Sequence, residues 1–310
     1  MKHLFILNPF AGGNKGRLAE TEGAIRAVAE SFAEPYEIYE TKAPMDACDK
    51  IANEAESADM LYVYACGGDG TLNECVNGAA KRANVAVTQY PCGTGNDFLR
   101  MFGKENLDKF RDLHALAGGA VKPIDLIDCS GRYGINICSV GIDARVGADV
   151  HKYSGIPVIG GATGYVVALA VNIIKGVTQK FHIISEGMEF DKPITLLCAC
   201  NGRFYGGGFN PVPDAMPDDG ILEYLIIDGA SRLKVLQIVG KYAKGRYREL
   251  QNFITYIRGT CMEIKCDREF VVNIDGEAVY AEKICFDIVP NGVNFLFPSG
   301  LDFSAWKHSN

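Results

Sequence analysis

The segment from Tyr62 to Glu74, with the sequence YVYACGGDGTLNE, constrains the fold more than any other part of this chain. An apolar run typical of a buried strand ends in a glycine-rich turn, and apolar residues at helical spacing follow. Glycines in such a strand–turn–helix unit let an anion approach bare backbone N–H groups. A carboxylate in that turn would repel the anion, so Asp69 is better explained as the partner of a divalent cation or of a donor hydroxyl. The alternative is a tight turn in which Asp69 only caps the helix.

The first 120 or so residues alternate strand-like and helix-like segments. Continuous apolar strands such as LFIL at residues 4–7 indicate a parallel sheet that is covered on both faces. Glycine turns follow these strands at their carboxyl ends, where open α/β sheets bind ligands. We therefore predict a doubly wound, Rossmann-like α/β domain over residues 1–122. The expected strands are residues 3–8, 36–40, 60–66 and 85–90, and the expected helices are residues 16–32, 44–57, 71–81, 96–102 and 107–117.

From residue 121 onward, short strands are separated by Gly, Asp and Asn turns, which is typical of an antiparallel β-sandwich. We predict such a domain over residues 123–290, with one helix inserted at residues 232–250. Residues 291–310 form a C-terminal segment that could return to the N-terminal domain. The expected strands of the second domain are residues 123–129, 133–140, 180–185, 194–201, 221–227, 262–266, 270–274 and 283–289.

One segment resembles a membrane span in length. Residues 156–174 are almost uncharged, but Pro157 and neighbouring glycines interrupt the first half. The helix that we expect, at residues 165–175, is too short to cross a bilayer. We therefore expect a buried helix, or one that lines an apolar substrate cleft.

Composition limits the classes of function. A net charge of −7 argues against nucleic-acid binding, which usually requires a basic surface. We expect the chain to begin with a strand and to have no signal peptide. The eleven cysteines are scattered without the paired spacing of a zinc site, so we expect reduced thiols and a cytoplasmic protein. Five cysteines lie in apolar, strand-like runs and are expected to be buried: Cys66, Cys138, Cys198, Cys200 and Cys285.

Two further glycine turns follow predicted strands. Residues 8–17, NPFAGGNKGR, lack the spacing of a Walker A loop, although Lys15 and Arg17 at a helix start suit a polyphosphate. A solvated turn is the alternative. Residues 91–98, PCGTGNDF, add side-chain donors at Thr94 and Asn96. Three glycine turns at one edge of a single sheet together indicate a phosphate-binding site.

Two acidic motifs lie in the second domain. Residues 213–221, PDAMPDDGI, place adjacent carboxylates beside free carbonyls, an all-oxygen set that suits Mg²⁺ or Ca²⁺. An Asp-Asp-Gly hairpin turn explains the motif equally well. Residues 273–277, NIDGE, end a strand; Asp275 and Gly276 could form a type I′ turn, and Glu277 could act as a general base toward a hydroxyl.

In this order and spacing, five motifs resemble those of the bacterial diacylglycerol kinase-like lipid kinases, whose superfamily includes eukaryotic diacylglycerol, sphingosine and ceramide kinases. The motifs are N-P-x-x-G, G-G-D-G-T-L-N-E, G-T-G-N-D-F, D-D-G and D-G-E, and they extend from Asn8 to Glu277. The resemblance implies an α/β domain of the NAD kinase/diacylglycerol kinase type plus a β-sandwich, with ATP and the lipid headgroup meeting between them. It also implies transfer of the γ-phosphoryl group of ATP to a hydroxyl of a lipid such as diacylglycerol.

The resemblance further implies roles for single residues. Glu277 would be the general base, and Asp69 would organise the catalytic Mg²⁺ with Asp218 assisting through water. Asp219, with the backbone carbonyls of Met216 and Ile221, would hold a structural Mg²⁺. The residues implied to contact ATP are Asn8, Pro9, Phe10, Ala11, Gly12, Thr41, Gly68, Asp69, Gly70, Thr71, Leu72, Asn73, Glu74 and Thr94.

Two of these assignments have less support from the motifs. Thr41 rests only on its position after the second strand. The extra Gly13-Asn14 before Lys15 departs from the family pattern and leaves Lys15 as an optional phosphate ligand.

The expected partner is a lipid substrate at the membrane surface, with peripheral attachment at its inner face and a homodimer as options. The neutral segment at residues 156–174 would suit a wall for acyl chains. Basic residues on or after the helix at 232–250 either face anionic lipid or form a solvated face. They are Lys234, Lys241, Lys244, Arg246 and Arg248.

Two other functions stay open. A NAD kinase shares G-G-D-G-T on a related fold, although the remaining motifs follow the lipid-kinase pattern. A catalytically silent nucleotide- or lipid-binding protein is the second, against which the intact Asp69, Asp219 and Glu277 argue. The sequence does not name the lipid.

Overall fold

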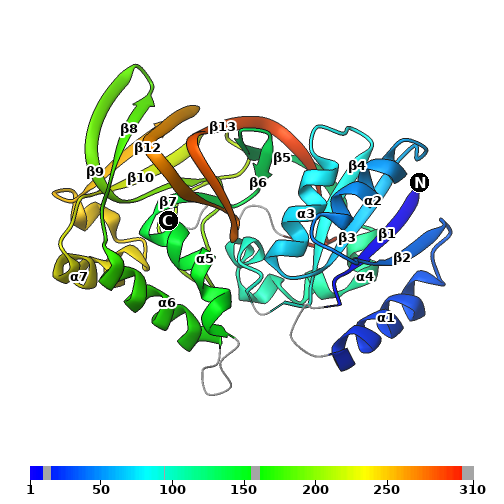
Figure 1. The fold of residues 1–310 in the computed structure, drawn as a ribbon. Helices are drawn as coiled ribbons and strands as arrows, with labels where there is room; N and C mark the ends of the chain where they lie inside the picture. Colours follow the sequence, from blue (N-terminus) through cyan, green and yellow to red (C-terminus); the bar gives the residue numbers. More distant parts are fainter. Residues whose placement is uncertain (10–14, 94, 155–160, 302–310) are drawn as a thin grey trace. The chain divides into compact units, whose positions relative to one another are not determined.

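The structure is a computed structural model of the 310-residue chain, and it describes residues 1–9, 15–93, 95–154 and 161–301 (Figure 1). The chain divides into two compact units. Unit 1 comprises Met1–Leu126 and Pro290–Asn310, and unit 2 comprises Ile127–Val289. The described part of the C-terminal segment, residues 291–301, therefore belongs to the same unit as the N-terminus.

Unit 1 is built on a parallel sheet whose strands lie in the order β4–β3–β1–β2. The C-terminal end of β13 extends this sheet in parallel, because Asn294 and Phe295 pair with Ala86 and Val87 of β4. The strands are β1 (Lys2–Leu7), β2 (Tyr36–Glu40), β3 (Leu61–Gly67), β4 (Val85–Pro91) and β13 (Glu277–Phe297).

The helices of unit 1 follow its strands, as the alternating pattern predicted. The expected helix at 96–102 is a shorter 3₁₀ turn, and the expected helix at 107–117 is broken because the Asp112 side chain caps a new helix through the N–H groups of His114 and Ala115. The elements are α1 (Lys15–Ala29), α2 (Asp46–Ala55), α3 (Asp69–Ala79), η2 (Phe98–Phe102), η3 (Lys104–Asn106), η4 (Lys109–Arg111) and α4 (Leu113–Ala117).

The core of unit 1 explains why its strands are continuously apolar. Leu4, Phe5 and Ile6 are all fully buried, because both faces of the sheet are covered. Aromatic rings hold the end of β13 in this core: Phe295 packs on Phe98, and their ring centroids are 5.3 Å apart. The return of the chain to unit 1 is thus stabilised by apolar packing as well as by strand pairing.

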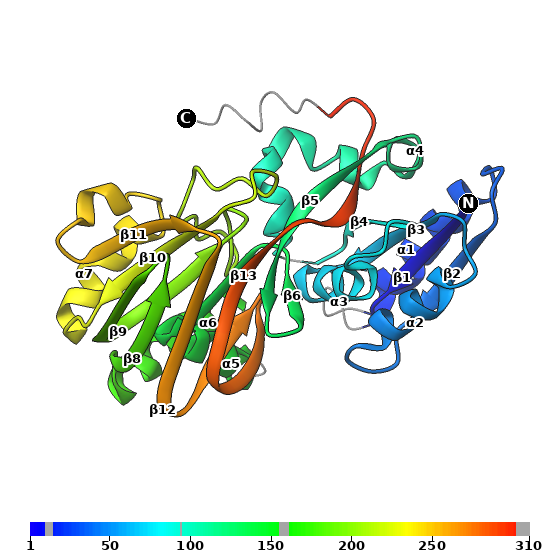
Figure 2. The ribbon, with the colours of Figure 1, turned by 90° about the horizontal axis from the view of Figure 1, so that it is seen from above.

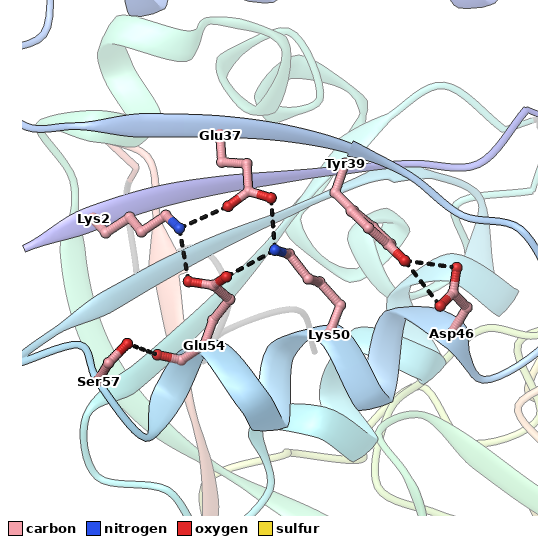
Figure 3. A network of polar contacts seen from close by, with 7 residues as sticks. All are labelled: Lys2, Glu37, Tyr39, Asp46, Lys50, Glu54 and Ser57. Carbon is pink, nitrogen blue, oxygen red and sulfur yellow. Dashed lines mark hydrogen bonds and ion pairs between the residues drawn. The ribbon is translucent and has the colours of Figure 1, made fainter.

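An ion-pair network joins β1, β2 and α2 on the surface of unit 1 (Figure 3). Lys2 lies 2.7 Å from both Glu37 and Glu54, and Lys50 lies 2.6 Å from Glu37 and 2.7 Å from Glu54. The hydrogen bonds from Lys2 and Lys50 hold the pKa of Glu54 below its usual value. Each charge therefore has two opposite partners.

Unit 2 is built on antiparallel strands in the order β11–β10–β9–β7–β12–β13, with β8 paired to both β9 and β12 (Figure 2). A short hairpin of β5 and β6 lies off this path, where β5 pairs with β13. The strands are β5 (Ala120–Cys129), β6 (Arg132–Gly134), β7 (Ile137–Gly141), β8 (Gln179–Ser185), β9 (Met188–Cys200), β10 (Leu222–Asp228), β11 (Ile254–Gly259) and β12 (Cys261–Ile274).

Two apolar clusters form the core of unit 2. The first lies where α5 (Ile142–Ser154), α6 (Gly161–Lys175) and α7 (Arg232–Tyr242) pack on β9 and β10. The second contains residues of β8, β9, β10, β12 and β13 and is built from strands alone. Unit 2 is therefore a β-sandwich whose helices gather around the first cluster.

Unit 2 also differs from the sequence-based expectation. Helix α5 and strand β11 were not predicted. The helix expected at 232–250 ends at Tyr242, because Gly245 adopts a positive φ of 68° before the turn η5 (Tyr247–Leu250). Among the described residues, no helix combines the length and the apolarity that a bilayer crossing requires.

Candidate active site

The loops after β1, β3 and β4 contact one another at the carboxyl edge of the unit 1 sheet. The Asn8 side-chain amide donates to the hydroxyl of Thr71 at 3.1 Å. The backbone N–H groups of Cys92 and Gly93 donate to the Gly67 carbonyl at 3.1 and 3.2 Å. Three of the predicted site segments are thus joined by hydrogen bonds.

Two glycines lie at this close approach. A Cβ atom on Gly93 would lie 2.5 Å from the Cα atom of Gly68, and one on Gly95 would lie 2.4 Å from a carboxylate oxygen of Asp69. The backbone of Gly68 cannot give way, so position 93 requires glycine, whereas a side chain at position 95 would push the Asp69 carboxylate aside.

Asp69 is the first residue of α3 and does not cap it. Gly68 is the N-cap residue, in an extended conformation. The Asp69 carboxylate instead accepts a 2.6 Å hydrogen bond from the backbone N–H of Asp97. The alternative explanation of Asp69 as a helix cap is therefore wrong, and its carboxylate lies between two glycine loops beside a helix N-terminus, where the helix dipole favours negative charge.

Asp97 is a candidate site residue that was not predicted from the sequence. Its side chain is only 6% exposed and forms an ion pair with Arg100 at 2.9 Å. It places a second carboxylate next to Asp69. The signal that could have found it is its position two residues after Gly95, in a loop already assigned to phosphate binding.

The remaining predicted nucleotide contacts have different environments. Thr41 lies beside the end of β1, where its N–H donates to the Leu7 carbonyl at 2.9 Å. Leu72 and Asn73 are buried in unit 1, whereas Pro9 and Glu74 are half-buried. Four predicted contacts lie outside the described residues: Phe10, Ala11, Gly12 and Thr94.

In unit 2, Glu277 begins β13 directly after a two-residue hairpin turn. Asp275 and Gly276 have positive φ angles of 51° and 101°, as a type I′ turn requires, and Ile274 pairs with Glu277 across it. The Asn273 side chain accepts a hydrogen bond from the Gly276 N–H at 2.7 Å. The turn predicted as an alternative to a catalytic role is present, and it holds the exposed Glu277 at a strand end.

The carboxylate of Asp275 fixes this hairpin to the loop before β7. It accepts backbone hydrogen bonds from Ile135 at 2.7 Å and from Asn136 and Ile137, both at 3.0 Å. Three such bonds to one carboxylate position the turn and the strand that begins with Glu277. This role was not predicted, because nothing in a D-G-E motif indicates what the aspartate binds.

The acidic loop at residues 214–221 is held by two arginines. Arg203 is 4% exposed and donates to the Ala215 carbonyl at 2.9 Å and to the Met216 sulfur at 3.1 Å. Asp219 accepts hydrogen bonds from the N–H of Ile221 at 3.1 Å and from Arg258 at 2.9 Å. Asp218 is exposed. Met216, Asp219 and Ile221, predicted to hold a structural ion, and Asp218, predicted to assist the catalytic ion through water, are all part of this one loop.

A buried carboxylate beside this loop was not predicted. Glu223 is 1% exposed, and burial together with the charge of Asp219 raises its pKa to about 8, although Arg258 opposes this shift. One of its oxygens is buried and has no hydrogen-bond partner among the described residues. Asp219 and Glu223 both pair with Arg258. Among the described residues, no group of three or more His, Cys, Asp or Glu side chains forms a metal cluster.

A narrow apolar cavity of about 50 Å³ lies among the helices of unit 2. Leu169 of α6 and Val235, Ile238 and Val239 of α7 line it, together with the buried Asp143 of α5. The Asp143 carboxylate accepts a 2.7 Å hydrogen bond from Ser139. The cavity is thus an apolar space that contains one carboxylate.

The cysteines mostly follow the prediction. All eleven are free thiols, and burial raises the pKa of Cys66, Cys138 and Cys200 well above the usual value. The expectation for Cys285 is wrong, because this residue is only half-buried: the strand it occupies has one exposed face.

Comparison with known proteins places this arrangement in a family. The sequence profile of the diacylglycerol kinase catalytic domain matches residues 2–129, and that of the YegS C-terminal NAD kinase beta sandwich-like domain matches residues 136–297. A Staphylococcus haemolyticus protein named "Putative lipid kinase" is 28% identical over 258 residues, which are 82% of each chain. A Staphylococcus aureus protein of the same description is 25% identical over 248 residues, which are 80% of each chain.

Solved structures show the same fold. The crystal structure of a Bacillus anthracis protein described as a "putative diacylglycerol kinase" has a TM-score of 0.75 at 23% identity, and the match covers 97% of this chain and 98% of that one. A second structure from the same organism, described as a diacylglycerol kinase, has a TM-score of 0.68 at 21% identity. The chain belongs to the diacylglycerol kinase catalytic domain family of lipid kinases, as the five motifs predicted, and is a phosphotransferase of that family.

Proposed function

We propose that this protein transfers the γ-phosphoryl group of ATP to a hydroxyl group of a lipid such as diacylglycerol. The observation that carries the proposal is that the Asp275 carboxylate fixes the hairpin that bears Glu277. The other unit of the chain has a glycine-lined sheet edge around Asp69. Phosphoryl transfer depends on positioning and charge neutralisation more than on covalent chemistry. Candidate residues for both positioning and charge neutralisation are present in this chain.

The nucleotide is proposed to bind at the carboxyl edge of the unit 1 sheet. The glycines of the loops after β3 and β4 have no Cβ atoms that would block access of a phosphate to the backbone N–H groups. The N-terminus of α3 favours the negative charge of a phosphate. Asn8 and Thr71, which bond each other, would provide side-chain contacts at the same edge.

Asp69 and Glu277 are proposed to have different roles. The Asp69 carboxylate would hold the catalytic Mg²⁺, which supplies charge neutralisation when it is bound, and the exposed Asp218 would assist through water. Glu277 would accept the proton of the lipid hydroxyl. A strand-end carboxylate fixed by a tight turn suits this role, because a general base must stay within hydrogen-bond reach of the proton that it removes.

A second Mg²⁺ is proposed for the acidic loop of unit 2. Asp219 and the carbonyls of Met216 and Ile221 would hold it, as the family resemblance implies. The position of Glu223 beside Asp219 and Arg258 supports this proposal, since a nearby cation would favour the charged form of both acidic side chains. The role of such an ion would be to stabilise unit 2.

The acceptor is proposed to be a lipid, because the helices of unit 2 enclose an apolar cavity. The cavity volume of about 50 Å³ is too small for an acyl chain. The side chains that line the cavity would therefore have to move apart when an acyl chain enters. Asp143 would give this apolar site one polar group that can bind a headgroup hydroxyl.

The test is to incubate the purified protein with labelled ATP, Mg²⁺ and a panel of acceptors. The panel contains diacylglycerol, monoacylglycerol, phosphatidylglycerol, a sphingoid base, undecaprenol and NAD. Label transfer to one of the lipids, lost in Glu277→Gln, is the expected result. Transfer to NAD alone would instead identify a NAD kinase, and ATP binding without transfer to any acceptor would indicate a silent binding protein.

A further inference from the structure

Three large apolar side chains of the α6–α7 region face solvent. Ile174, at the end of α6, is 72% exposed, and Leu233 and Leu236 of α7 are 74% and 57% exposed. Leu233 and Leu236 are three residues apart and therefore lie on one face of the helix. We call these three residues the α6–α7 patch. Few large apolar side chains in the described part of the chain are as exposed.

The two helices that carry this patch are tied together by one side chain. The guanidinium group of Arg232 donates to the Ile173 carbonyl at 2.9 Å and to the Ile174 carbonyl at 2.8 Å. The start of α7 is therefore held against the end of α6, and Ile174 lies close to the first turn that carries Leu233. The three apolar side chains thus belong to one surface.

The surroundings of the patch are basic. Residues 229–248 contain six arginines and lysines and no acidic residue, in a chain whose net charge is −7. Some of these charges are paired: Lys241 lies 3.1 Å from Glu249, and Arg248 lies 2.7 Å from Asp214. Those nearest the patch interact with neutral groups instead, since Arg232 binds carbonyls and Lys234 lies over the ring of Phe253. Positive charge is therefore retained beside the exposed leucines.

The patch and the apolar cavity lie on different faces of the same helix, α7. Leu233 and Leu236 face outward, while Val235, Ile238 and Val239 of the same helix line the cavity. One helix thus has an apolar surface toward solvent and another toward the space proposed for an acyl chain. If the outer face of α7 contacts a bilayer, only the thickness of this helix separates the bilayer from the cavity.

We propose that the α6–α7 patch docks on the surface of an anionic lipid bilayer, with Leu233, Leu236 and Ile174 inserted among the acyl chains. This arrangement is that of an interfacial helix, in which apolar side chains enter the membrane and neighbouring lysines and arginines bind anionic headgroups. The proposal rests on the proposed lipid acceptor, because docking would place the cavity at the membrane that contains the substrate.

The experiment measures flotation of the full-length protein with phosphatidylcholine vesicles, with and without phosphatidylglycerol, in the absence of ATP. We expect binding to vesicles that contain phosphatidylglycerol, and we expect Leu233→Ser/Leu236→Ser to weaken it by about tenfold or more. Arg232→Gln/Lys234→Gln should weaken binding at low salt and have little effect at high salt, where headgroup charges are screened.

Two controls keep the result specific. Met188 and Tyr280 are also exposed, at 44% and 59%, but they lie on strands of unit 2, so Met188→Ser/Tyr280→Ser should bind vesicles like the parent. Phosphorylation of detergent-dispersed lipid should be the same in the leucine variant and the parent. That assay tests the proposed function by itself, whereas flotation without ATP tests docking by itself.

Two results would overturn the docking proposal. In the first, the leucine variant floats as well as the parent. In the second, the parent is a dimer by light scattering and the leucine variant is a monomer, which would assign the patch to an interface between two copies of this chain.

Discussion

The carboxylate of Asp69 accepts a 2.6 Å hydrogen bond from the backbone N–H of Asp97, which joins the loop after β3 to the loop after β4. This bond uses one oxygen of the carboxylate, and it needs an acceptor but no charge. Asp69 therefore has a structural contact that asparagine can retain and a charge that asparagine lacks.

We expect Asp69→Asn to abolish phosphoryl transfer while it unfolds within a few degrees of the parent. Asp69→Ala should lose the hydrogen bond as well and be destabilised by about 1 kcal/mol. Thermal unfolding and a kinase assay on both variants separate the two roles. A catalytically active Asp69→Asn protein would show that the carboxylate charge is not required.

The general-base role predicts a fall in kcat for Glu277→Gln of about 10²–10⁴, with unchanged affinity for ATP. Glutamine keeps the shape of the side chain but cannot accept the proton. Steady-state kinetics and ATP titration test this expectation. A kcat within about threefold of the parent's would remove Glu277 from the mechanism.

Asp275→Ala is the matched variant on the same turn. Removal of the Asp275 carboxylate leaves three backbone N–H groups without their acceptor. We therefore expect destabilisation by roughly 1–3 kcal/mol as well as lower activity. Glu277→Gln should unfold like the parent, because the structure gives its exposed side chain no supporting role. Equal stability of the two variants would contradict the proposed positioning by Asp275.

The proposed second Mg²⁺ predicts that the melting temperature rises with Mg²⁺ in the parent and not in Asp219→Asn. A ligand that binds only the native state stabilises it by about 2.7 kcal/mol at a concentration 100 times its Kd. Asp214→Asn is the control, because Asp214 lies in the same loop but pairs with Arg248. If Asp219→Asn responds to Mg²⁺ as the parent does, the ion binds elsewhere.

The ion-pair network of Figure 3 predicts a dependence of stability on pH. The pKa values of Glu37 and Glu54 are lowered from 4.5 in the folded protein, so these groups stabilise it above that pH. The contribution is lost as the pH falls through their folded pKa values.

Lys50→Met removes the cation that binds both carboxylates and keeps most of the apolar stem. We expect its free energy of unfolding to be about 0.5–1 kcal/mol below the parent's at neutral pH, since pairs this exposed are screened by water. The difference should disappear at acid pH. Urea unfolding at several pH values tests this, and a difference that persists in acid would assign the effect to packing.

Two Gly→Ala variants, one in a glycine loop and one inside a helix, are expected to have opposite effects on stability. Gly93→Ala would place a methyl group 2.5 Å from the Cα atom of Gly68, so we expect destabilisation by about 1–3 kcal/mol and weaker ATP binding. Gly23→Ala, inside α1 with open space around it, should stabilise the protein by up to about 1 kcal/mol. Similar effects in both variants would show that the loop contact is unimportant.

Local pattern was informative wherever neighbours in sequence decide the structure. The continuous apolar run of β1 and the glycine turns after β3 and β4 predicted a parallel sheet with its ligand edge, since both signals arise within about ten residues. Helix α5 was missed, because Gly147 lies inside it and its helical face is decided by packing, mainly on α6 and β12, rather than by spacing alone. The end of α7 depended on one positive φ at Gly245.

The sequence by itself determined the two-part α/β and β-sandwich architecture, the glycine loops, the turn before Glu277 and the family. Only the tertiary structure decided which groups these residues bind. Asp69 meets Asp97 across 28 positions, Asp275 meets Ile135 across 140, and Glu223 is buried beside Asp219 and Arg258. The physical reason is that a motif records which residues are present, whereas the partner of a carboxylate is decided by strand pairing and loop packing between segments far apart in the chain.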